Sequence, residues 1–132
     1  MDAIRQADSD GNPSTVQDER WQPLLVSPPF PTYTSGHSTF SGAADAVLTV
    51  LLGENVSFVA SNDRQPAPGQ RPIASEKVLF REFASFASAA NEAGRSRVFG
   101  GVHFEFDNSA GLEAGRAIGR LVAGSIMRRT IL

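Results

Sequence analysis

The sequence predicts a mainly α-helical domain, a partial helical bundle of about three main helices preceded by an irregular arm over residues 1–33. Three observations support this prediction. Apolar residues recur at helical spacing in three stretches, glycines follow two of these stretches, and all eight prolines lie outside them. A chain of 132 residues is long enough for one core but not for two, so we expect residues 1–132 to form a single domain.

The arm over residues 1–33 is predicted to be irregular. Its segment 8–13 (Asp-Ser-Asp-Gly-Asn-Pro) is typical of turns, and four later prolines exclude a regular helix or a central strand. An arm of this length is uncommon in a compact domain unless it is functional or packed down. We therefore expect its large apolar residues to anchor it to the helical body; they are Trp21, Leu24, Leu25 and Phe30.

One spacing in the arm suggests calcium. Asp8, Asp10, Asn12 and Glu19 stand at positions 1, 3, 5 and 12 of a calcium-binding loop. The sixth position of such a loop needs glycine for its sharp turn, and Pro13 occupies it here. No amphipathic helix flanks the segment. A plain surface turn is therefore the favoured interpretation.

The first helix is predicted over 38–52. Its apolar residues lie nearly all around the helix, so we expect it to be buried. Thr34, Ser35 and Ser38 are candidate N-caps, and Gly53 is the expected stop. The segment Ser-Gly-His at 35–37 therefore precedes a helix, where free N–H groups and the helix dipole favour an anion.

Two further helices are predicted beyond a loop at 62–71. The second covers about 75–93, with Phe83 in its apolar stripe, and ends at Gly94. The third covers about 112–127. Small residues recur every four positions in and before this helix and form a ridge along which another helix could approach closely: Gly111, Gly115, Gly119 and Ala123.

Composition excludes several classes of protein. Twelve Lys and Arg against fourteen Asp and Glu give a net charge of -2, so neither nucleic acid nor an anionic membrane is indicated as a partner. The absence of cysteine excludes disulfides, thiolate catalysis and Cys-ligated zinc. We find no signal peptide and no apolar run of about 20 residues, so a soluble chain is expected and its compartment is left open.

Two segments concentrate the chemistry. Residues 96–107 hold Arg97, one of the two histidines and two carboxylates, and residues 33–39 hold the other histidine. A permanent cation, imidazoles, small hydroxyls and backbone amides suit an oxyanion such as phosphate. In either a strand or a helix, Asp107 could accept a hydrogen bond from His103 Nδ1–H and leave Nε2 free. The alternative is a half-buried amphipathic segment whose His and Asp only pair with each other.

Two other catalytic patterns do not fit these segments. The pattern His103-x-Glu105 occurs in zinc deaminases, but their Pro-Cys-x-x-Cys partner is missing because the chain has no cysteine. A serine hydrolase requires Gly-x-Ser-x-Gly, and residues 34–37 do not fit. A zinc site of two histidines and carboxylates remains open.

Taken together, the two segments carry a family resemblance. Ser-Gly-His at 35–37, followed by Ser96-Arg97, Gly101-x-His103 and Asp107, resembles the second and third signature motifs of the vanadium-dependent haloperoxidase and type 2 phosphatidic acid phosphatase superfamily. The flanking segments 29–33, 37–44, 92–97 and 100–104 are similar to a bacterial haloperoxidase branch. The resemblance covers nearly all of the chain and implies the helical bundle of the haloperoxidase and acid phosphatase type.

The resemblance also implies an activity. His103 would be the vanadate ligand of a haloperoxidase that oxidises halide with hydrogen peroxide, Asp107 would orient it, and His37 would be the acid–base residue. In the rival phosphomonoesterase, phosphate would replace vanadate, the substrate would be a phosphate ester, and His103 would form a phosphohistidine. Under either activity, Arg97, the Ser35 hydroxyl and the Gly36 amide would bind the oxyanion's oxygens.

Two departures from the family pattern stand out. Thr34 occupies a position where the family usually has proline. The family's first motif, a lysine and an Arg-Pro pair seven residues apart, is absent from the 132 residues. The chain thus resembles the C-terminal half of such an enzyme, and a truncated, non-catalytic helical module is a third possibility. We expect either a homo-oligomer or association with the missing N-terminal half.

Overall fold

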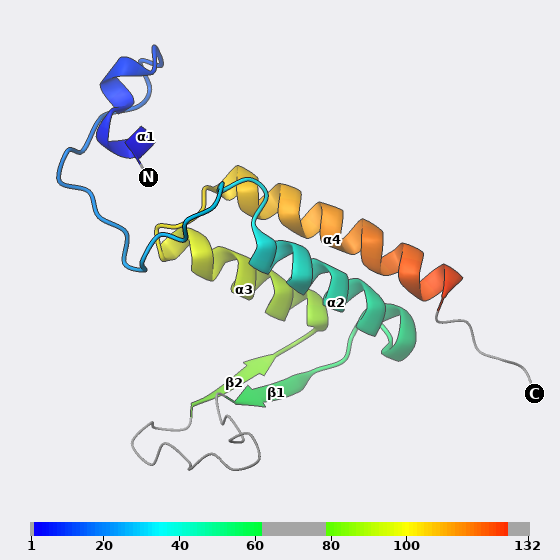
Figure 1. The fold of residues 1–132 in the computed structure, drawn as a ribbon. Coiled ribbons are helices and arrows are strands. Elements are labelled where there is room, and N and C mark those ends of the chain that lie inside the picture. Colours follow the sequence, from blue (N-terminus) through cyan, green and yellow to red (C-terminus); the bar gives the residue numbers. More distant parts are fainter. Residues whose placement is uncertain (1, 62–78, 127–132) are drawn as a thin grey trace, which may run out of the picture.

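The computed structural model describes residues 2–61 and 79–126, and three long helices dominate it (Figure 1). The predicted partial bundle is confirmed. The predicted loop at 62–71, the predicted helix start at Ser75 and the predicted helix end at Met127 lie outside the described residues. The elements are α1 (Asp2–Arg5), a 3-10 turn (Ala7–Ser9), α2 (Gly36–Leu52), β1 (Phe58–Ser61), β2 (Phe80–Phe83), α3 (Phe86–Phe99) and α4 (Glu105–Ser125).

The limits of α2 agree closely with the sequence. Ser35 is the N-cap, and its side chain accepts a hydrogen bond from the Ser38 N–H at 3.3 Å. Gly53 follows the helix with a φ of 104°, a conformation that favours glycine. The helix therefore begins slightly before the predicted Ser38, directly on the Ser-Gly-His segment.

The small-residue ridge packs α4 against α2, and the two helices run in the same direction (Figure 1). All three ridge glycines are buried. A Cβ on any of them would collide with an α2 carbonyl oxygen, so the close approach requires glycine. Successive glycines of α4 face successive carbonyl oxygens along the α2 segment. The added Cβ would lie 2.7 Å from the Ser35 oxygen at Gly111, against the Thr39 oxygen at Gly115, and 2.5 Å from the Ala43 oxygen at Gly119.

The second helix differs from its prediction. Ser85 caps α3 through a reciprocal pair of hydrogen bonds with Ser88, so the helix begins at Phe86. Phe83 belongs instead to β2, which pairs antiparallel with β1. Gly94 does not end the helix; it is buried within α3, where a Cβ would strike the side chain of Asn108. Glycine is retained here for close packing rather than for a helix stop.

The third helix begins earlier than predicted, at Glu105 rather than Leu112. Asp107 lies in its first turn, where its carboxylate accepts a hydrogen bond from the Phe104 N–H at 2.9 Å. A carboxylate at this position also interacts favourably with the positive end of the helix dipole. The sequence allowed either a strand or a helix over 102–107. The structure shows that a helix begins within this segment.

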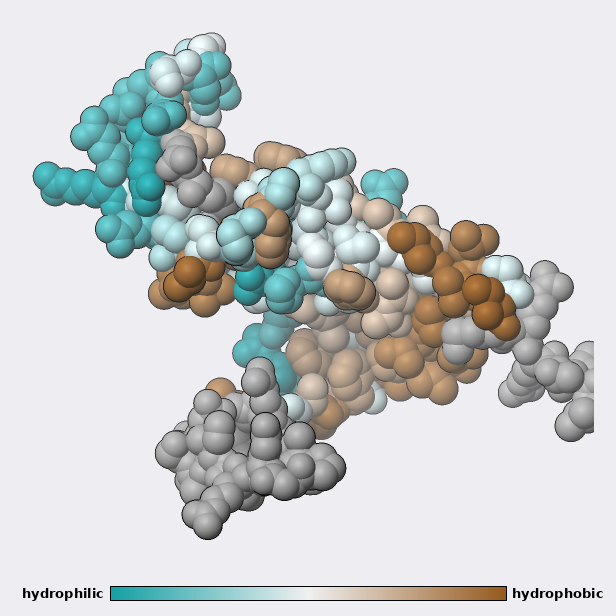
Figure 2. Space-filling model, viewed as in Figure 1, coloured by the Kyte–Doolittle hydropathy of each residue, from teal (hydrophilic) through white to brown (hydrophobic). Residues whose placement is uncertain are grey.

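The expectation that the first helix would be buried all round is wrong. The buried positions of α2 are small or polar, and Phe40 is 82% exposed. The described residues cover only the face that packs on α3 and α4. Large apolar side chains stay exposed toward the C-terminal ends of α2 and α4, where the hydrophobic colour gathers in Figure 2: Val50, Leu51, Leu52, Ile118, Leu121 and Ile126.

The arm is pinned at fewer points than expected. The Leu25 N–H donates to the Gly100 carbonyl at 3.0 Å, and Trp21 lies against Gly101. Leu24 is 83% exposed, so its predicted anchoring is wrong. The arm thereby lies against the turn that joins α3 to α4.

Residues 8–15 of the arm make turn hydrogen bonds, as the surface-turn interpretation predicts. Asp10 Oδ1 accepts a hydrogen bond from the Asn12 N–H at 2.7 Å, and Asn12 Oδ1 accepts one from Ser14. Within residues 2–61 and 79–126, no three His, Asp or Glu side chains are grouped so that they could hold a metal ion. In the same part of the chain, no helix is long and apolar enough to cross a membrane.

Candidate oxyanion site

One end of the bundle brings together the N-terminal ends of α2 and α4 and the C-terminal end of α3 (Figure 1). The Ser35 N–H donates to the Asp107 carbonyl at 3.1 Å and ties α2 to α4. The Val102 N–H donates to the Arg97 carbonyl at 3.1 Å and folds the α3–α4 turn. All six predicted site residues lie on these three helix ends and the turn between them: Ser35, Gly36, His37, Arg97, His103 and Asp107.

Asp107 and His103 lie together in the interior. The carboxylate is fully buried, and the imidazole is 3% exposed. His103 Nδ1 is 3.5 Å from Asp107 Oδ2, an ion-pair separation that is longer than a good hydrogen bond. The predicted Nδ1–H bond to Asp107 is therefore not formed in this structure. Oδ2 instead accepts the Phe104 N–H, so the carboxylate holds the start of α4 directly behind the imidazole.

Three buried polar atoms of the site have no hydrogen-bond partner among the described residues: Arg97 Nε, His103 Nδ1 and Asp107 Oδ1. A buried polar atom without a partner costs about 1–3 kcal/mol, and more when the group is charged. Arginine Nε is a permanent donor, and an imidazole nitrogen donates in one of its tautomers. His103 Nδ1 faces the Asp107 carboxylate, so Arg97 Nε is the unpaired donor that could serve an oxygen-rich anion.

Arg97 and His103 both affect the pKa of His37. Its pKa lies below the usual value for histidine, first because of partial burial, then because of the positive charge of Arg97, and then because of His103. Such charge effects require that Arg97 and His103 lie near His37. The lowered pKa keeps the exposed His37 imidazole neutral at neutral pH, the form that can accept a proton.

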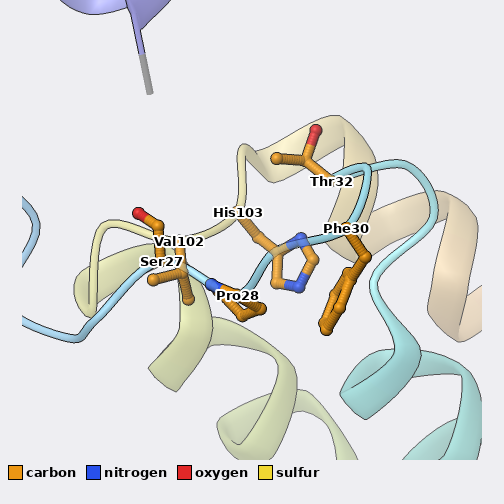
Figure 3. A pocket seen from close by; sticks show the side chains of 6 residues that line it. All are labelled: Ser27, Pro28, Phe30, Thr32, Val102 and His103. Carbon is orange, nitrogen blue, oxygen red and sulfur yellow. The ribbon is translucent and has the colours of Figure 1, made fainter.

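A pocket of about 180 Å³ opens beside His103. Figure 3 shows the imidazole facing side chains of the arm across this pocket. Phe30, predicted as an anchor, forms part of its wall and is 59% exposed. No periodic pattern marks the other arm residues of the wall, because an irregular segment has no repeat to detect. The remaining lining residues are Ser27, Pro28, Thr32 and Val102.

Comparison with known proteins shows which family the chain belongs to. A family model described as the VCPO second helical-bundle domain matches residues 3–130. The chain belongs to the vanadium haloperoxidase family. A vanadium chloroperoxidase of Curvularia inaequalis is 29% identical to it over 109 residues, which cover 63% of this chain.

Solved structures of haloperoxidases agree with the fold. A bacterial vanadium-dependent iodoperoxidase is 42% identical and matches 81% of this chain with a TM-score of 0.65. A bacterial vanadium-dependent chloroperoxidase matches 83% of the chain with a TM-score of 0.61, at 21% identity. The chain spans only 18% of the length of the fungal enzyme and 24% and 23% of the two bacterial chains.

Proposed function

We propose that this chain supplies the vanadate ligand and part of the surrounding oxyanion site of a vanadium-dependent haloperoxidase, an enzyme that oxidises halide with hydrogen peroxide. The observation that carries the proposal is an unpaired buried donor, Arg97 Nε, at the meeting point of three helix ends that also hold the buried His103. The 42% identity to an iodoperoxidase adds support.

The donors present fit vanadate. Arg97 offers a planar, permanently charged fork that suits oxyanions. Gly36 begins α2, and a Cβ there would meet nothing within 4 Å, so its backbone is open to a ligand. The Ser35 hydroxyl lies at the same helix N-terminus, whose dipole favours negative charge. His103 would hold the vanadium centre through Nε2, since Nδ1 faces Asp107.

The roles of the two histidines follow from their surroundings. Vanadate, when bound, would activate peroxide toward attack by halide. Neutral His37 can take a proton from a peroxide oxygen and return it later, because its lowered pKa leaves the imidazole unprotonated. The Asp107 carboxyl group lies beside His103 Nδ1, which favours a proton on Nδ1 and leaves Nε2 as the ligand atom.

The 132-residue chain supplies little positive charge to this site. Arg97 is the one site residue with a permanent positive charge, and the buried Asp107 offsets it. An oxyanion with two or three negative charges needs several cations to be drawn out of water. We therefore propose that a segment carrying further cations, absent from this sequence, completes the site by packing on the exposed apolar faces of α2 and α4.

The test is a titration of the 132-residue chain with orthovanadate, followed by backbone amide shifts in nuclear magnetic resonance spectra. We expect shifts at Gly36, Ser38 and the 97–103 turn. His103→Ala should abolish binding and any peroxidase activity. Asp107→Ala should weaken binding by about 10–100-fold, as partners of metal-binding histidines typically do.

Asn91→Ala is the matched control, because Asn91 bonds Arg116 between α3 and α4 away from the site. It should bind vanadate like the wild type. Shifts confined to other regions, or unchanged binding in His103→Ala, would refute the site. A parallel titration with inorganic phosphate tests the phosphomonoesterase alternative: phosphate binding with release of phosphate from an ester, and no halide oxidation, would favour it.

A further inference from the structure

Asn108 is a buried polar residue beside the proposed oxyanion site. It follows Asp107 in the first turns of α4, and its side chain is 2% exposed. Its amide nitrogen donates to Glu105 Oε1 at 2.9 Å, and its amide oxygen accepts a hydrogen bond from the Ser38 hydroxyl at 2.9 Å. Because an ionised carboxylate can only accept, the bond to Glu105 fixes which end of the amide faces Ser38.

The contact joins the three helices that form the site. Gly94 of α3 lies directly under the Asn108–Ser38 bond, and a Cβ at Gly94 would strike Asn108 Oδ1 and lie 2.9 Å from Ser38 Oγ. Arg97 lies one helical turn beyond Gly94, and Asp107 precedes Asn108. The bond thus lies at the start of α2, one residue after Asp107 and about one helical turn from Arg97.

The direction of the hydrogen bonds follows from counting hydrogens. Ser38 Oγ is 2.9 Å from Asn108 Oδ1 and also 2.9 Å from Ser35 Oγ, but a hydroxyl has one hydrogen to donate. Asn108 Oδ1 can only accept, so it takes the Ser38 hydrogen. Ser38 Oγ must then accept from Ser35. The Ser35 hydroxyl then gives its one hydrogen to Ser38, so a chain of bonds from Ser35 through Ser38 to Asn108 ties the N-cap of α2 to α4.

We propose that Asn108 is a positioning residue for the oxyanion site. This inference rests on the proposed function: Asn108 acts through Ser38, holding the N-terminus of α2 against α4 and fixing the position of Ser35. All three side chains are buried, so water does not compete for these bonds. The geometry of Ser35 and Gly36 relative to His103 then depends on the Ser38–Asn108 bond.

A double-mutant cycle with orthovanadate as the probe tests the proposal. Asn108→Ala and Ser38→Ala should each weaken vanadate binding by about tenfold, and the double variant should lose little more than either single variant, because they break one shared bond. Ser38→Thr keeps the hydroxyl and should restore binding to within a few fold. Asn91→Ala, the remote control, should bind within twofold of the wild type.

Amide hydrogen exchange without ligand provides a second, independent measurement. The Ser38 and Thr39 N–H groups bond to Ser35. We expect them to exchange at least tenfold faster in Asn108→Ala than in the wild type or Asn91→Ala. If the wild type binds no vanadate, the proposed function fails, and the exchange rates alone decide the positioning role. Unchanged exchange together with unchanged vanadate affinity in Asn108→Ala would overturn the inference.

Discussion

Adding one methyl group to the glycine ridge of α4 tests the packing that brings the helix ends together. In Gly119→Ala, the new Cβ would lie 2.5 Å from the Ala43 carbonyl oxygen. An ordinary carbon–oxygen contact is about 3.3–3.6 Å, so α2 and α4 must part by roughly 1 Å. Overpacking of this kind costs about 1–3 kcal/mol.

Gly124→Ala is the matched control in the same helix, because a Cβ there would meet nothing within 4 Å. Replacing glycine by alanine inside a helix stabilises by up to about 1 kcal/mol at either position, so this gain largely cancels in the comparison. Urea unfolding should therefore find Gly119→Ala less stable than Gly124→Ala by about 1–3 kcal/mol. Equal stability of the two variants would refute the close parallel packing.

Two glycines of the same ridge allow effects on stability and on vanadate affinity to be measured separately. In Gly111→Ala, the new Cβ would lie 2.7 Å from the Ser35 carbonyl oxygen, at the proposed oxyanion site. Gly119 faces α2 two turns farther along. Both variants should lose stability, but only Gly111→Ala should also lose vanadate affinity at temperatures where it remains folded. Loss of affinity in both variants would mean that the site depends on the whole α2–α4 contact.

Four further predictions concern charge and assembly. Vanadate binding should raise the pKa of His37, measured from its ring-proton shifts, because an anion offsets the positive charges that now lower it; an unchanged pKa would place the anion elsewhere. Without vanadate, stability should fall as the pH drops below about 6.5, since the unfolded chain then takes up the His37 proton before the folded chain does. Arg97→Lys should weaken vanadate binding by about tenfold or more, because lysine cannot present the planar fork that contains the unpaired Nε; equal affinity would reduce Arg97 to a point charge. The 132-residue chain should self-associate in sedimentation experiments, because its apolar helix faces are exposed. It should oxidise bromide only weakly with added vanadate, because its site has one permanent cation. A monomer with full turnover would show that another residue replaces the missing lysine and arginine.

Several features could be predicted because they depend on residues close in sequence. Ser35 caps α2 through a bond to Ser38, three residues away, and Gly53 ends the helix through its own φ. The four-residue spacing of the ridge glycines places them on one face of any helix, whichever partner covers that face. The Ser-Gly-His and Arg–His–Asp segments likewise carried the family resemblance before their arrangement in space was known.

Other features depended on contacts between distant residues. β2 replaced the predicted start of a helix because 80–83 pairs with 58–61 across the chain, and pairing of this kind leaves little local signal. Gly94 was predicted to stop a helix, a correct interpretation of glycine in isolation, but Asn108 occupies the space that a side chain would need. The exposed Phe40 shows the opposite error, since an apolar residue is buried only where another element covers it.

Residue types and their spacing already indicate which groups the candidate site contains: one guanidinium, two imidazoles, a carboxylate, a hydroxyl and a helix N-terminus. Which of their atoms are left without partners depends on how the helices pack. In the folded chain, Asp107 Oδ2 accepts a hydrogen bond from the Phe104 N–H, and Asn108 accepts one from Ser38. Arg97 Nε and His103 Nδ1 are buried without a hydrogen-bond partner among the described residues. The physical reason is that residue type fixes how many hydrogen bonds a group can make, whereas packing fixes which of those bonds remain for a ligand.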